Sequence, residues 1–486
     1  MIRRPLLGLL VVAVGGCSSL LVATQGPALR RQVEVLRGPG GERLRVDGQL
    51  GRALHAVSFD RLRFSADGRH FAVPVERRRG EAALLRDGTV GPPSPPILDL
   101  ALSADGARLA TVLHRDGRAE VQLDGRSAPP WDEVGRHTLA FTGDGRLRFV
   151  GRREGGTHLV VSGTAGPRWD GVGELREEPG GHRLAYLARR GPQGFLVVVD
   201  GERHQPRGPF DAIAELAWSS RGELGALVRE RGLWSAIRWG DDPAAPSWRS
   251  AAYESASDLA FTADGANLFF IAHRRGLQHV VVDGAEQLGA DLIVRGSLTA
   301  RGRRIAYVAR FGAASRVLVD GQFGPPHDEV RDLALAPGGH HFAYLAVDRG
   351  AWRLWIDGAE QPPIDQAHSL GIDDQGRVAL VHRQWTQERI ASPAGAARFD
   401  VVLERSLVLS DDGRHFACLA GDRRGERFFI AVDGEARYPL APGLLGRLFQ
   451  RSIPELLVGT PDPFAAARTL VAAVLARHLE AAPAPR

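Results

Sequence analysis

Between Phe64 and Leu440, short apolar runs alternate with polar turns that contain glycine. The stretch from Asp99 to Val134 shows the unit, in which four apolar runs are separated by turns at Asp105-Gly106, Asp116-Gly117 and Asp124-Gly125. Asp-Gly between apolar runs predicts a tight β-hairpin, because a type I′ turn needs positive φ at both central residues and glycine adopts positive φ without steric cost. Each unit therefore predicts four short antiparallel strands, the pattern of one blade of a β-propeller.

The unit is repeated along the chain in two series of turns that stay in phase. The first turn recurs in ten copies, at Asp67-Gly68, Asp105-Gly106, Asp144-Gly145, Gly180-Gly181, Arg221-Gly222, Asp264-Gly265, Arg301-Gly302, Gly338-Gly339, Gln375-Gly376 and Asp412-Gly413. The third turn recurs at Asp87-Gly88, Asp124-Gly125, Ser162-Gly163, Asp200-Gly201, Asp283-Gly284, Asp320-Gly321, Asp357-Gly358 and Asp433-Gly434. It is irregular near residues 239–246 and 392–395, which makes the fifth and ninth repeats the least regular. Four strands of ~6 residues with connections of ~3 to 4 give a repeat of roughly 38 residues, about the spacing of these turns.

The apolar runs are continuous and rich in β-branched residues, as at 196–199, 279–282 and 316–319. Such runs predict strands buried on both faces, as expected where each blade lies between two others. First strands include small residues, as in Leu216-Ala217-Trp218, and these suit crowding near a central axis. We therefore predict an all-β chain: a β-propeller of about ten four-stranded repeats, in one large ring or two smaller rings, plus a short C-terminal helical segment.

The closure of the array has two solutions. Residues 33–54 match the later part of a repeat without its beginning, so the array starts within a blade. One ring would close by pairing this half-blade with strands near the C-terminus, such as 455–459, and the regular step of the turns favours it. Two rings would divide at the irregular interval 240–253, and they fit the ~4 to 8 blades of typical propellers better.

Beyond Leu440 the pattern becomes helical. Asp462 can cap a helix, Pro463 suits its first position, and the run 464–479 has one stripe formed by Ala467, Leu470, Val471, Val474 and His478. We expect this helix to pack on the propeller, and a helix on a membrane surface is the alternative. The predicted domains are a signal peptide (1–16), a tether (17–32), the propeller repeats (33–440, with a division near 240–253 if there are two rings) and a helical tail (441–486).

The amino terminus has the order of an export signal. Arg3 and Arg4 precede an apolar run, and Gly15-Gly16-Cys17 follows directly. Residues 14–17 resemble a bacterial lipobox, in which the cysteine is lipidated and becomes the first mature residue. The resemblance implies a cell-envelope lipoprotein anchored through Cys17, on the periplasmic side of the outer membrane or on the cell surface. The alternative is an uncleaved anchor or a plain secretory signal, although the run is short against the ~20 residues that span a bilayer.

The composition is that of a globular protein. The 486 residues are 44% hydrophobic and 24% charged, which is enough for a large core. The chain has no lysine, so arginine accounts for its basic character, and a net charge of +5 is weak support for nucleic-acid binding. Cys17 and Cys418 are the two cysteines, so no disulfide framework holds the fold together.

Strings such as FSADGRHFA, LAYLARRGPQGFLVVVDGE and IAYVARFGAASRVLVDGQ resemble the WD-like repeats of bacterial TolB-type propellers. The resemblance covers about residues 60 to 440. It implies the propeller fold and brings no catalytic residues, because that family is defined mostly by blade-forming positions. The chain departs from TolB itself in its ten copies and in the absence of a recognisable amino-terminal α/β domain, so the partners of TolB are not transferred to it.

The sequence offers no residues for catalysis. It contains no HExxH, Walker or GxSxG pattern, and Cys418 lies in the apolar string FACLA, where it is expected to be a small hydrophobe. His70, His340 and His415 follow the first turn of their repeats, and residues repeated with a structural period favour a role in the blade over a metal site. The acid pairs at 241–242, 373–374 and 411–412 lack the spacing of a calcium loop and indicate turns. We predict no catalytic residue, no metal and no cofactor.

Two groups of polar residues follow the repeat. Fourth strands end in an aromatic residue that can cover the blade edge and an aspartate that can bind loop amides, at Trp131-Asp132, Trp169-Asp170, Phe210-Asp211, His327-Asp328 and Phe399-Asp400. Loops between second and third strands share one face and predict an anion-binding rim, formed by Arg78, Arg152, Arg153, Arg189, Arg190, Arg274, Arg275, Arg423 and Arg424. A salt-bridged, solvated face is the alternative, because loops between blades bring acids to it, namely Asp132, Glu133, Asp170, Asp211, Asp328, Glu329 and Asp332.

Export, the repeat array and the lack of a catalytic motif together favour one function. We expect a non-enzymatic, lipid-anchored scaffold of the cell envelope that presents a β-propeller to an envelope protein or glycan. The alternative is an envelope hydrolase or lyase with its active site in the central funnel of the propeller, which converging carboxylates or histidines would reveal. Export disfavours nucleic acid as a partner.

Overall fold

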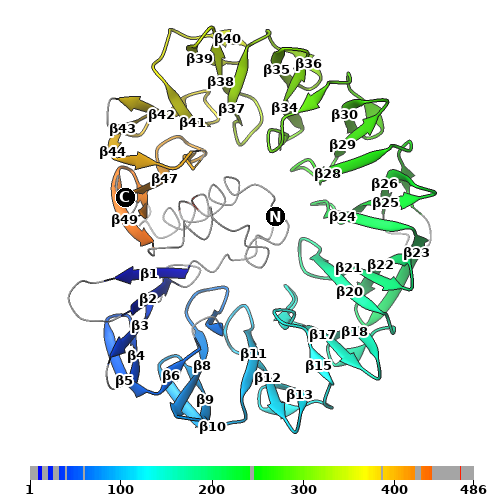
Figure 1. Cartoon of the computed structure of the whole chain (residues 1–486), viewed down its shortest axis with the longest axis vertical. Coiled ribbons are helices and arrows are strands. Elements are labelled where there is room, and N and C mark those ends of the chain that lie inside the picture. The colour runs from blue at the N-terminus through cyan, green and yellow to red at the C-terminus, as the bar shows by residue number, and fades with distance from the viewer. Residues whose placement is uncertain are drawn as a thin grey trace. The chain divides into compact units, whose positions relative to one another are not determined.

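The computed structural model of the chain describes residues 9–13, 20–25, 32–38, 41–58, 61–240, 246–384, 387–404, 406–421, 428–440, 471 and 475. Within these ranges the strands form eleven antiparallel sheets, each built from consecutive stretches of the chain and named A to K here in chain order (Figure 1). The chain divides into two compact units, Met1–Arg249 with sheets A to F and Ser250–Arg486 with sheets G to K.

The first unit contains six sheets. Sheet A comprises β1 (Leu9–Ala13), β2 (Leu20–Gln25), β3 (Gln32–Gly38), β4 (Gly41–Val46) and β5 (Gln49–Leu54). Sheet B comprises β6 (Ala56–Val57), β7 (Arg63–Phe64), β8 (Phe71–Arg78), β9 (Glu81–Arg86) and β10 (Thr89–Pro93). Sheet C comprises β11 (Ile97–Leu102), β12 (Leu109–Arg115), β13 (Arg118–Leu123) and β14 (Arg126–Ser127). Sheet D comprises β15 (Glu133–Val134), β16 (Ala140–Phe141), β17 (Leu147–Arg153), β18 (Gly156–Val161) and β19 (Thr164–Ala165). Sheet E comprises β20 (Gly171–Glu177), β21 (Arg183–Arg190), β22 (Gln193–Asp200) and β23 (Arg203–Phe210), and sheet F comprises β24 (Ala212–Trp218), β25 (Leu224–Glu230), β26 (Leu233–Trp239) and β27 (Trp248–Arg249).

The second unit contains five sheets. Sheet G comprises β28 (Ser255–Phe261), β29 (Leu268–Arg274), β30 (Leu277–Val282) and β31 (Ala285–Glu286). Sheet H comprises β32 (Leu292–Ile293), β33 (Thr299–Arg301), β34 (Arg304–Phe311), β35 (Ala314–Val319) and β36 (Gln322–Phe323). Sheet I comprises β37 (Glu329–Leu335), β38 (Phe342–Asp348), β39 (Ala351–Ile356) and β40 (Ala359–Glu360). Sheet J comprises β41 (Ala367–Ile372), β42 (Val378–Gln384), β43 (Gln387–Ser392) and β44 (Gly395–Phe399), and sheet K comprises β45 (Val401–Val402), β46 (Val408–Leu409), β47 (Phe416–Gly421), β48 (Phe428–Val432) and β49 (Glu435–Leu440).

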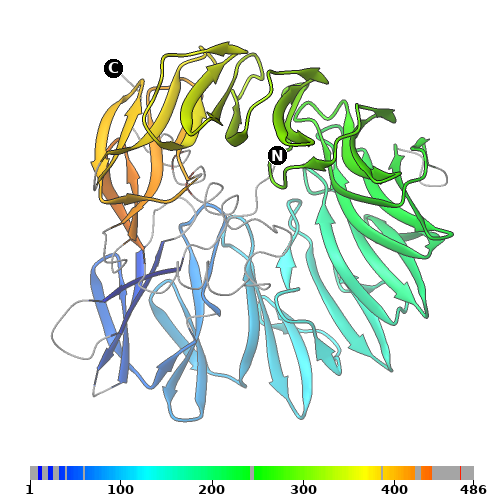
Figure 2. The ribbon, with the colours of Figure 1, turned by 45° about the horizontal axis from the view of Figure 1, so that its top comes forward.

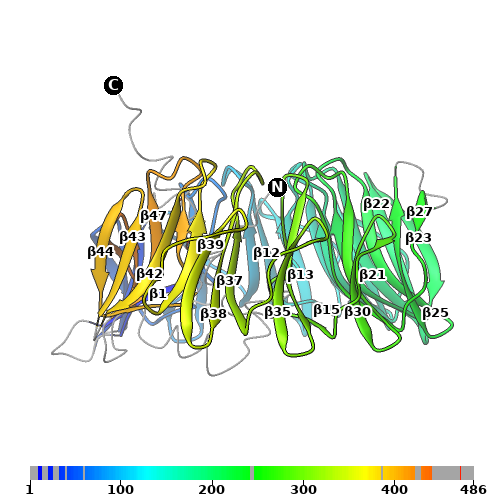
Figure 3. The ribbon, with the colours of Figure 1, turned by 90° about the horizontal axis from the view of Figure 1, so that it is seen from above.

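The ten predicted repeats correspond to sheets B to K, each with one first turn between its first and second strands. Sheets F and J, the irregular repeats, are formed like the others. In sheets B, D, H and K the first strand is broken into two pieces that both pair with the second strand, so these blades also have four strands in order. Within each unit, consecutive sheets lie beside one another, as sheets B to D show in the first unit (Figure 2) and sheets H to J in the second (Figure 3).

Sheet A contains the half-blade that the sequence placed at residues 33–54. Its strand β3 pairs with β2, which in turn pairs with β1, so this sheet begins before Val33. Residues 455–459, which were expected to pair with the half-blade, lie outside the described residues.

Most third turns are the type I′ hairpins that the sequence predicted, whereas at Asp200-Gly201 of sheet E only the glycine has positive φ. In sheet C, Asp124 has a φ of 51° and Gly125 a φ of 80°, and the other Asp-Gly third turns with this geometry are at Asp87, Asp283, Asp320, Asp357 and Asp433. Ser162-Gly163 of sheet D has the same conformation.

The first turns are different, and for them the type I′ prediction was wrong. In sheet C only the glycine, Gly106, has positive φ. Asp105 acts through its side chain instead: its Oδ1 accepts the hydroxyl of Ser103 at 2.6 Å and the backbone N–H of Ala107 at 3.0 Å. Aspartate is therefore selected here because its short carboxylate binds the backbone of its own turn.

A contact between the two turns explains why the two series stay in phase. In sheet B, His70 Nδ1 lies 2.9 Å from Asp87 Oδ2 in the third turn, while Asp87 Oδ1 accepts the N–H of Phe71 at 2.9 Å. Equivalent pairs join Arg108 to Asp124, Asn267 to Asp283, Arg304 to Asp320, His341 to Asp357 and His415 to Asp433. His70 and His415 thus serve the blade, as predicted, whereas in sheet I the equivalent residue is His341 and not the adjacent His340.

The apolar core lies in layers between consecutive sheets. In β22 the four residues Leu196 to Val199 are all at most 2% exposed, so both faces of this central strand are covered as the continuous apolar pattern predicted. Burying a side chain of this kind contributes ~1.5 to 3 kcal/mol, so the repeated layers supply most of the stability of each unit. Cys418 lies in such a layer, and burial raises the pKa of its thiol, which makes it an unreactive hydrophobe.

β-Bulges in the first strands let acidic side chains reach the next sheet. Asp99 Oδ2 in β11 accepts the N–H of His137 at 3.1 Å, and Asp332 Oδ2 in β37 accepts the N–H of Leu370 at 2.8 Å. The assignment of Asp332 to a loop between blades was therefore wrong, because the side chain is buried in a strand and bound to backbone. Glu133 and Glu329 likewise begin first strands.

The C-terminal helix was predicted to pack on the propeller. Val471 and Leu475, both helical, are 0% and 2% exposed and belong to one apolar cluster with residues of β47 and β48. These two residues thus make the expected contact with sheet K, and the rest of the predicted helix lies outside the described residues. Among the described residues, no helix is long and apolar enough to cross a membrane.

Candidate functional site

The predicted site residues fall into three groups. Cys17, Arg423 and Arg424 lie outside the described residues. Three of the other rim arginines stack on an aromatic residue. The guanidinium carbon of Arg153 lies 4.7 Å from the ring centroid of Trp131 and that of Arg190 4.7 Å from Trp169, each at the end of the preceding blade, and that of Arg274 lies 4.6 Å from Tyr253. Cation–π contacts of this kind contribute ~0.5 to 2 kcal/mol, so Arg153 and Arg190 help to join consecutive blades of the first unit.

The aspartates beside these aromatic residues cap the same loops. Asp132 accepts the N–H of Glu154 at 3.2 Å, Asp170 that of Gly191 at 2.6 Å and Asp328 that of Arg349 at 2.6 Å. The prediction that these aspartates satisfy loop amides is confirmed. The contact between sheets H and I replaces both partners of the stacked pair. His327 stands in place of the aromatic residue and Asp348 in place of the arginine, and His327 Nδ1 lies 2.8 Å from Asp348 Oδ2.

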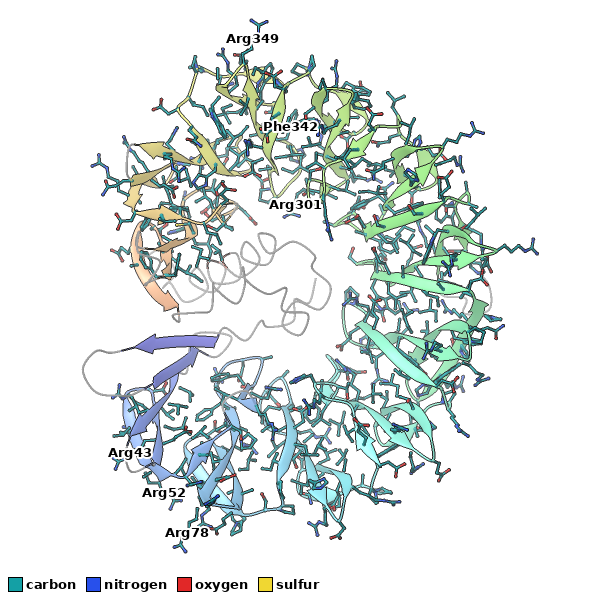
Figure 4. The ribbon with its side chains drawn as sticks, viewed as in Figure 1. Arg43, Arg52, Arg78, Arg301, Phe342 and Arg349 are labelled. Carbon is teal, nitrogen blue, oxygen red and sulfur yellow. The ribbon has the colours of Figure 1, made fainter. Side chains whose placement is uncertain are left out.

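The remaining rim arginines, Arg78, Arg152, Arg189 and Arg275, are exposed. Within the described part of the chain their side chains have no hydrogen-bond or ion-pair partner, and Figure 4 shows Arg78 projecting from its sheet. The acids expected to neutralise them are bound mainly to backbone amides. The anion-binding rim stays a prediction, now carried by these four side chains.

A groove between sheets C and D, with a volume of about 610 Å³, is the second candidate. We call it the C–D groove. Its floor is apolar and comes from both sheets, with Val121, Leu123 and Trp131 on one side and Leu147, Phe149 and Val160 on the other. The fourth strands on both sides of the groove, β14 and β19, have two residues each.

The walls of the C–D groove are mostly cationic. Four arginines line it, Arg108, Arg126, Arg146 and Arg153, against one acid, Asp144. Arg146 is fixed by its own turn and by the next blade, sheet E, because it donates to Asp144 at 2.8 Å and to the backbone carbonyls of His182 and Gly201, each at 2.6 Å. Arg108 pairs with Asp124 beside the groove at 3.2 Å. Arg126 is exposed and has no partner among the described residues.

Sheet D departs from the repeat at one position, and this departure leaves the groove with more positive charge than the repeat would give. In six other sheets an aspartate of the third turn pairs with the side chain that follows the first turn. Sheet D has Ser162 at that position, and Ser162 lines the C–D groove. The acid that would face Arg146 is therefore missing. This signal was present in the series of third turns, but the sequence alone did not show that Ser162 faces a groove.

The bulge of β20 places Glu174 in an environment that disfavours its charge. Burial raises the pKa of this carboxyl from its ordinary value of 4.5, Arg176 at 2.9 Å opposes the rise, and the nearby charge of Glu215 adds to it. The folded state therefore holds the proton of Glu174 more tightly than the unfolded state does. The stability gained from this more tightly held proton is fully present below pH 4.5 and is lost as the pH rises through the folded-state pKa of Glu174.

We expect Glu174→Gln to raise the melting temperature at pH 7, because glutamine is neutral and keeps an oxygen acceptor. The gain should shrink as the pH falls through the raised folded-state pKa towards 4.5 and be absent below 4.5, which thermal melts at several pH values would measure. Glu120→Gln is the control of opposite sign, since hydrogen bonds from Ser127 and Gln122 lower the pKa of Glu120. An equal response of both variants at pH 7 would contradict this account.

Repeated four-stranded sheets, packed one on the next within each unit through an apolar layer and joined by the same inter-blade contacts, define a β-propeller. No protein-family model matches the chain. No curated protein sequence matches it either.

Several solved structures are similar to part of this chain. A eukaryotic initiation factor is 12% identical with a TM-score of 0.34, over 69% of this chain and 96% of that one. Hydrazine synthase from Kuenenia stuttgartiensis is 12% identical with a TM-score of 0.24, over 53% and 94%. The β-propeller domain of the trilobed protease from Pyrococcus furiosus is 9% identical with a TM-score of 0.27, over 56% and 96%. The assignment to the propeller fold rests on the sheets themselves.

Proposed function

We propose that the protein is a non-enzymatic, lipid-anchored binding scaffold of the cell envelope, and that the propeller presents its surface to an anionic partner. The observation that carries the proposal is the C–D groove, an apolar floor with arginine walls and with Arg126 exposed above it. The polar residues that recur with the repeat, such as His70, Asp87 and Asp132, are bound within or between blades. A groove without a nucleophile or an acid–base pair at its floor suits binding better than chemistry.

The pairing of sheet A fits removal of a signal peptide. Strand β1 lies within the predicted signal peptide, and β2 lies in the tether that follows Cys17. Cleavage before Cys17 would remove β1 and leave β2 to β5, which have the four-stranded order of the other blades. A diacylglyceryl group on Cys17 would then hold the protein at the membrane, because two acyl chains anchor a protein stably.

We expect Cys17→Ala to abolish lipid labelling and membrane association in a bacterium that processes lipoproteins. The reason is that the thiol of Cys17 is the proposed acceptor of the lipid. Metabolic labelling with a fatty acid and fractionation of cell envelopes would measure both effects. Cys418→Ala is the matched control, and it should keep the label because Cys418 is fully buried.

Two outcomes would count against the proposal. If Cys17→Ala stays with the membrane, the C-terminal segment or a retained signal is the anchor. If the purified protein hydrolyses or cleaves glycans or peptides in an activity screen, and substitution of a cluster of acids or histidines stops the reaction, the protein is an enzyme and not a scaffold.

A further inference from the structure

We propose that the C–D groove binds an extended, acidic peptide segment of a partner protein, with an apolar or aromatic residue flanked by carboxylates at both ends. This inference rests on the proposed scaffold function and names the ligand class of its binding site. It follows from the length of the groove, from the positions of its charges and from the missing acid at Ser162.

The groove runs along the strands. Its lining residues on sheet D extend from Asp144 through Leu147 and Phe149 to Arg153, which is the whole of β17. At ~3.3 Å per residue, seven residues of strand span ~23 Å, which matches an extended segment of about six or seven residues. The ring of Trp131 lies in this floor, and it packs so closely on sheet D that a Cβ at Gly151 would be 2.6 Å from it.

The cations lie at both ends of this floor. Arg108, Arg126 and Arg146 are next to the first and third turns, at one end of the strands, whereas Arg153 ends β17 at the other. A lipid head group or a free phosphate concentrates its charge at one point, while a peptide can place a carboxylate at each end and an apolar side chain between them. The distribution of charge therefore favours a peptide over a lipid.

The groove is suited to recognise side chains rather than to add a strand. Pro129 and Pro130 follow β14 along its sheet, and proline has no N–H for a strand ladder, so this edge resists pairing with another chain. The guanidinium group of Arg153 lies over the ring of Trp131, so a cation and an aromatic ring meet at this end of the groove. The structure thus provides charged and aromatic contacts for side chains and withholds a continuous backbone edge.

Two substitutions test the site without touching the core. Ser162→Asp restores the acid of the repeat, and aspartate occupies the same turn at φ of 46° to 52° in six other sheets, so the variant is expected to fold. It should pair with Arg146 and place a negative charge in the groove. Arg126→Glu reverses the charge of an exposed side chain. Arg349→Glu, on an exposed arginine of sheet I that projects from its hairpin (Figure 4), is the matched control.

The probe is a library of random decapeptides displayed on phage, selected against the mature protein and followed by fluorescence anisotropy with the synthetic peptides. We expect enriched peptides with Asp or Glu on both sides of an aromatic residue or leucine, and an affinity that falls with added salt. Ser162→Asp and Arg126→Glu should each weaken binding about tenfold, the effect of one charged contact, while Arg349→Glu leaves it unchanged.

Enrichment of uncharged peptides, the absence of any enriched peptide, or equal binding by wild type and Ser162→Asp would overturn the assignment. So would loss of binding to phosphatidylglycerol vesicles in Arg126→Glu with no effect on peptides, because the groove would then be a lipid site. These failures are distinct from failure of the scaffold proposal, which would appear as turnover of a substrate or as membrane association without Cys17.

Discussion

Trp169→Ala is expected to destabilise the first unit by about 3 to 5 kcal/mol, the range for removing a buried aromatic side chain. Trp169 follows the fourth strand of sheet D, pairs with Thr157 of β18, and is 2% exposed. Its Nε1–H donates to the hydroxyl of Tyr186 at 3.2 Å, and its ring lies 5.1 Å from that of Phe195. Truncation would therefore leave a cavity between sheets D and E and would remove the surface on which Arg190 stacks.

Urea unfolding followed by circular dichroism would measure the loss of free energy of unfolding. Trp169→Phe should lose less, because an aromatic ring still fills most of the space but the hydrogen bond to Tyr186 is gone. Trp234→Ala is the matched control, since Trp234 is only half-buried on β26. A loss below 1 kcal/mol for Trp169→Ala, or an equal loss for Trp234→Ala, would show that this aromatic contact does not hold the two blades together.

The strands and hairpins could be predicted because they depend on local signals. A short, continuous apolar run with a turn at each end, such as 196–199, predicts a strand that is buried on both faces. An Asp-Gly pair such as Asp124-Gly125 predicts a tight hairpin, because both of its residues adopt positive φ. The half-blade at 33–54 was recognised for the same reason. Its pairing with β2 was missed, because β2 lies in a stretch that was assigned to the tether.

The contacts between blades could not be predicted in the same way. Asp105 was expected to adopt a positive φ, but its carboxylate binds Ser103 and the backbone of its own turn, a choice that depends on the side chain two residues earlier. The pairing of Arg153 with Trp131 joins residues of different repeats across an inter-sheet layer. The sequence pointed to both residues but placed Arg153 in an anion-binding rim, because the sequence alone carries no measure of the distance between the two side chains.

The candidate groove shows what a departure from a repeat contributes. The first residue of the third turn is aspartate in most repeats. In sheet D this residue is Ser162, so a negative charge is missing from one defined place, next to Arg146. The sequence contains this departure, but its meaning depends on the groove between sheets C and D that Ser162 lines. The substitution of Ser162 for aspartate therefore indicates a binding site only when the packing of sheets C and D is known.

Asp373→Ala is expected to destabilise the second unit by about 3 kcal/mol, through the loss of hydrogen bonds to a buried charge. The Asp373 side chain is 0% exposed. Its Oδ1 accepts the N–H groups of Gln375 and Arg377, both at 2.9 Å, and its Oδ2 lies 2.7 Å from a terminal nitrogen of the Arg377 guanidinium. That guanidinium also donates to the carbonyl of Asp412 at 2.8 Å, so Asp373 orients the contact from sheet J to the first turn of sheet K.

The neighbouring acid provides the control. Asp374 is exposed and its carboxylate accepts one N–H, that of Gly338 at 2.6 Å, so Asp374→Ala should cost at most ~1 kcal/mol. Asp373→Asn should fall between the two, because its amide oxygen can still accept the turn N–H groups while the ion pair with Arg377 is lost. Urea unfolding of the three variants gives the order of stability. Equal losses for Asp373→Ala and Asp374→Ala would mean that burial of the carboxylate in this turn does not matter, and that the turn is held by its backbone alone.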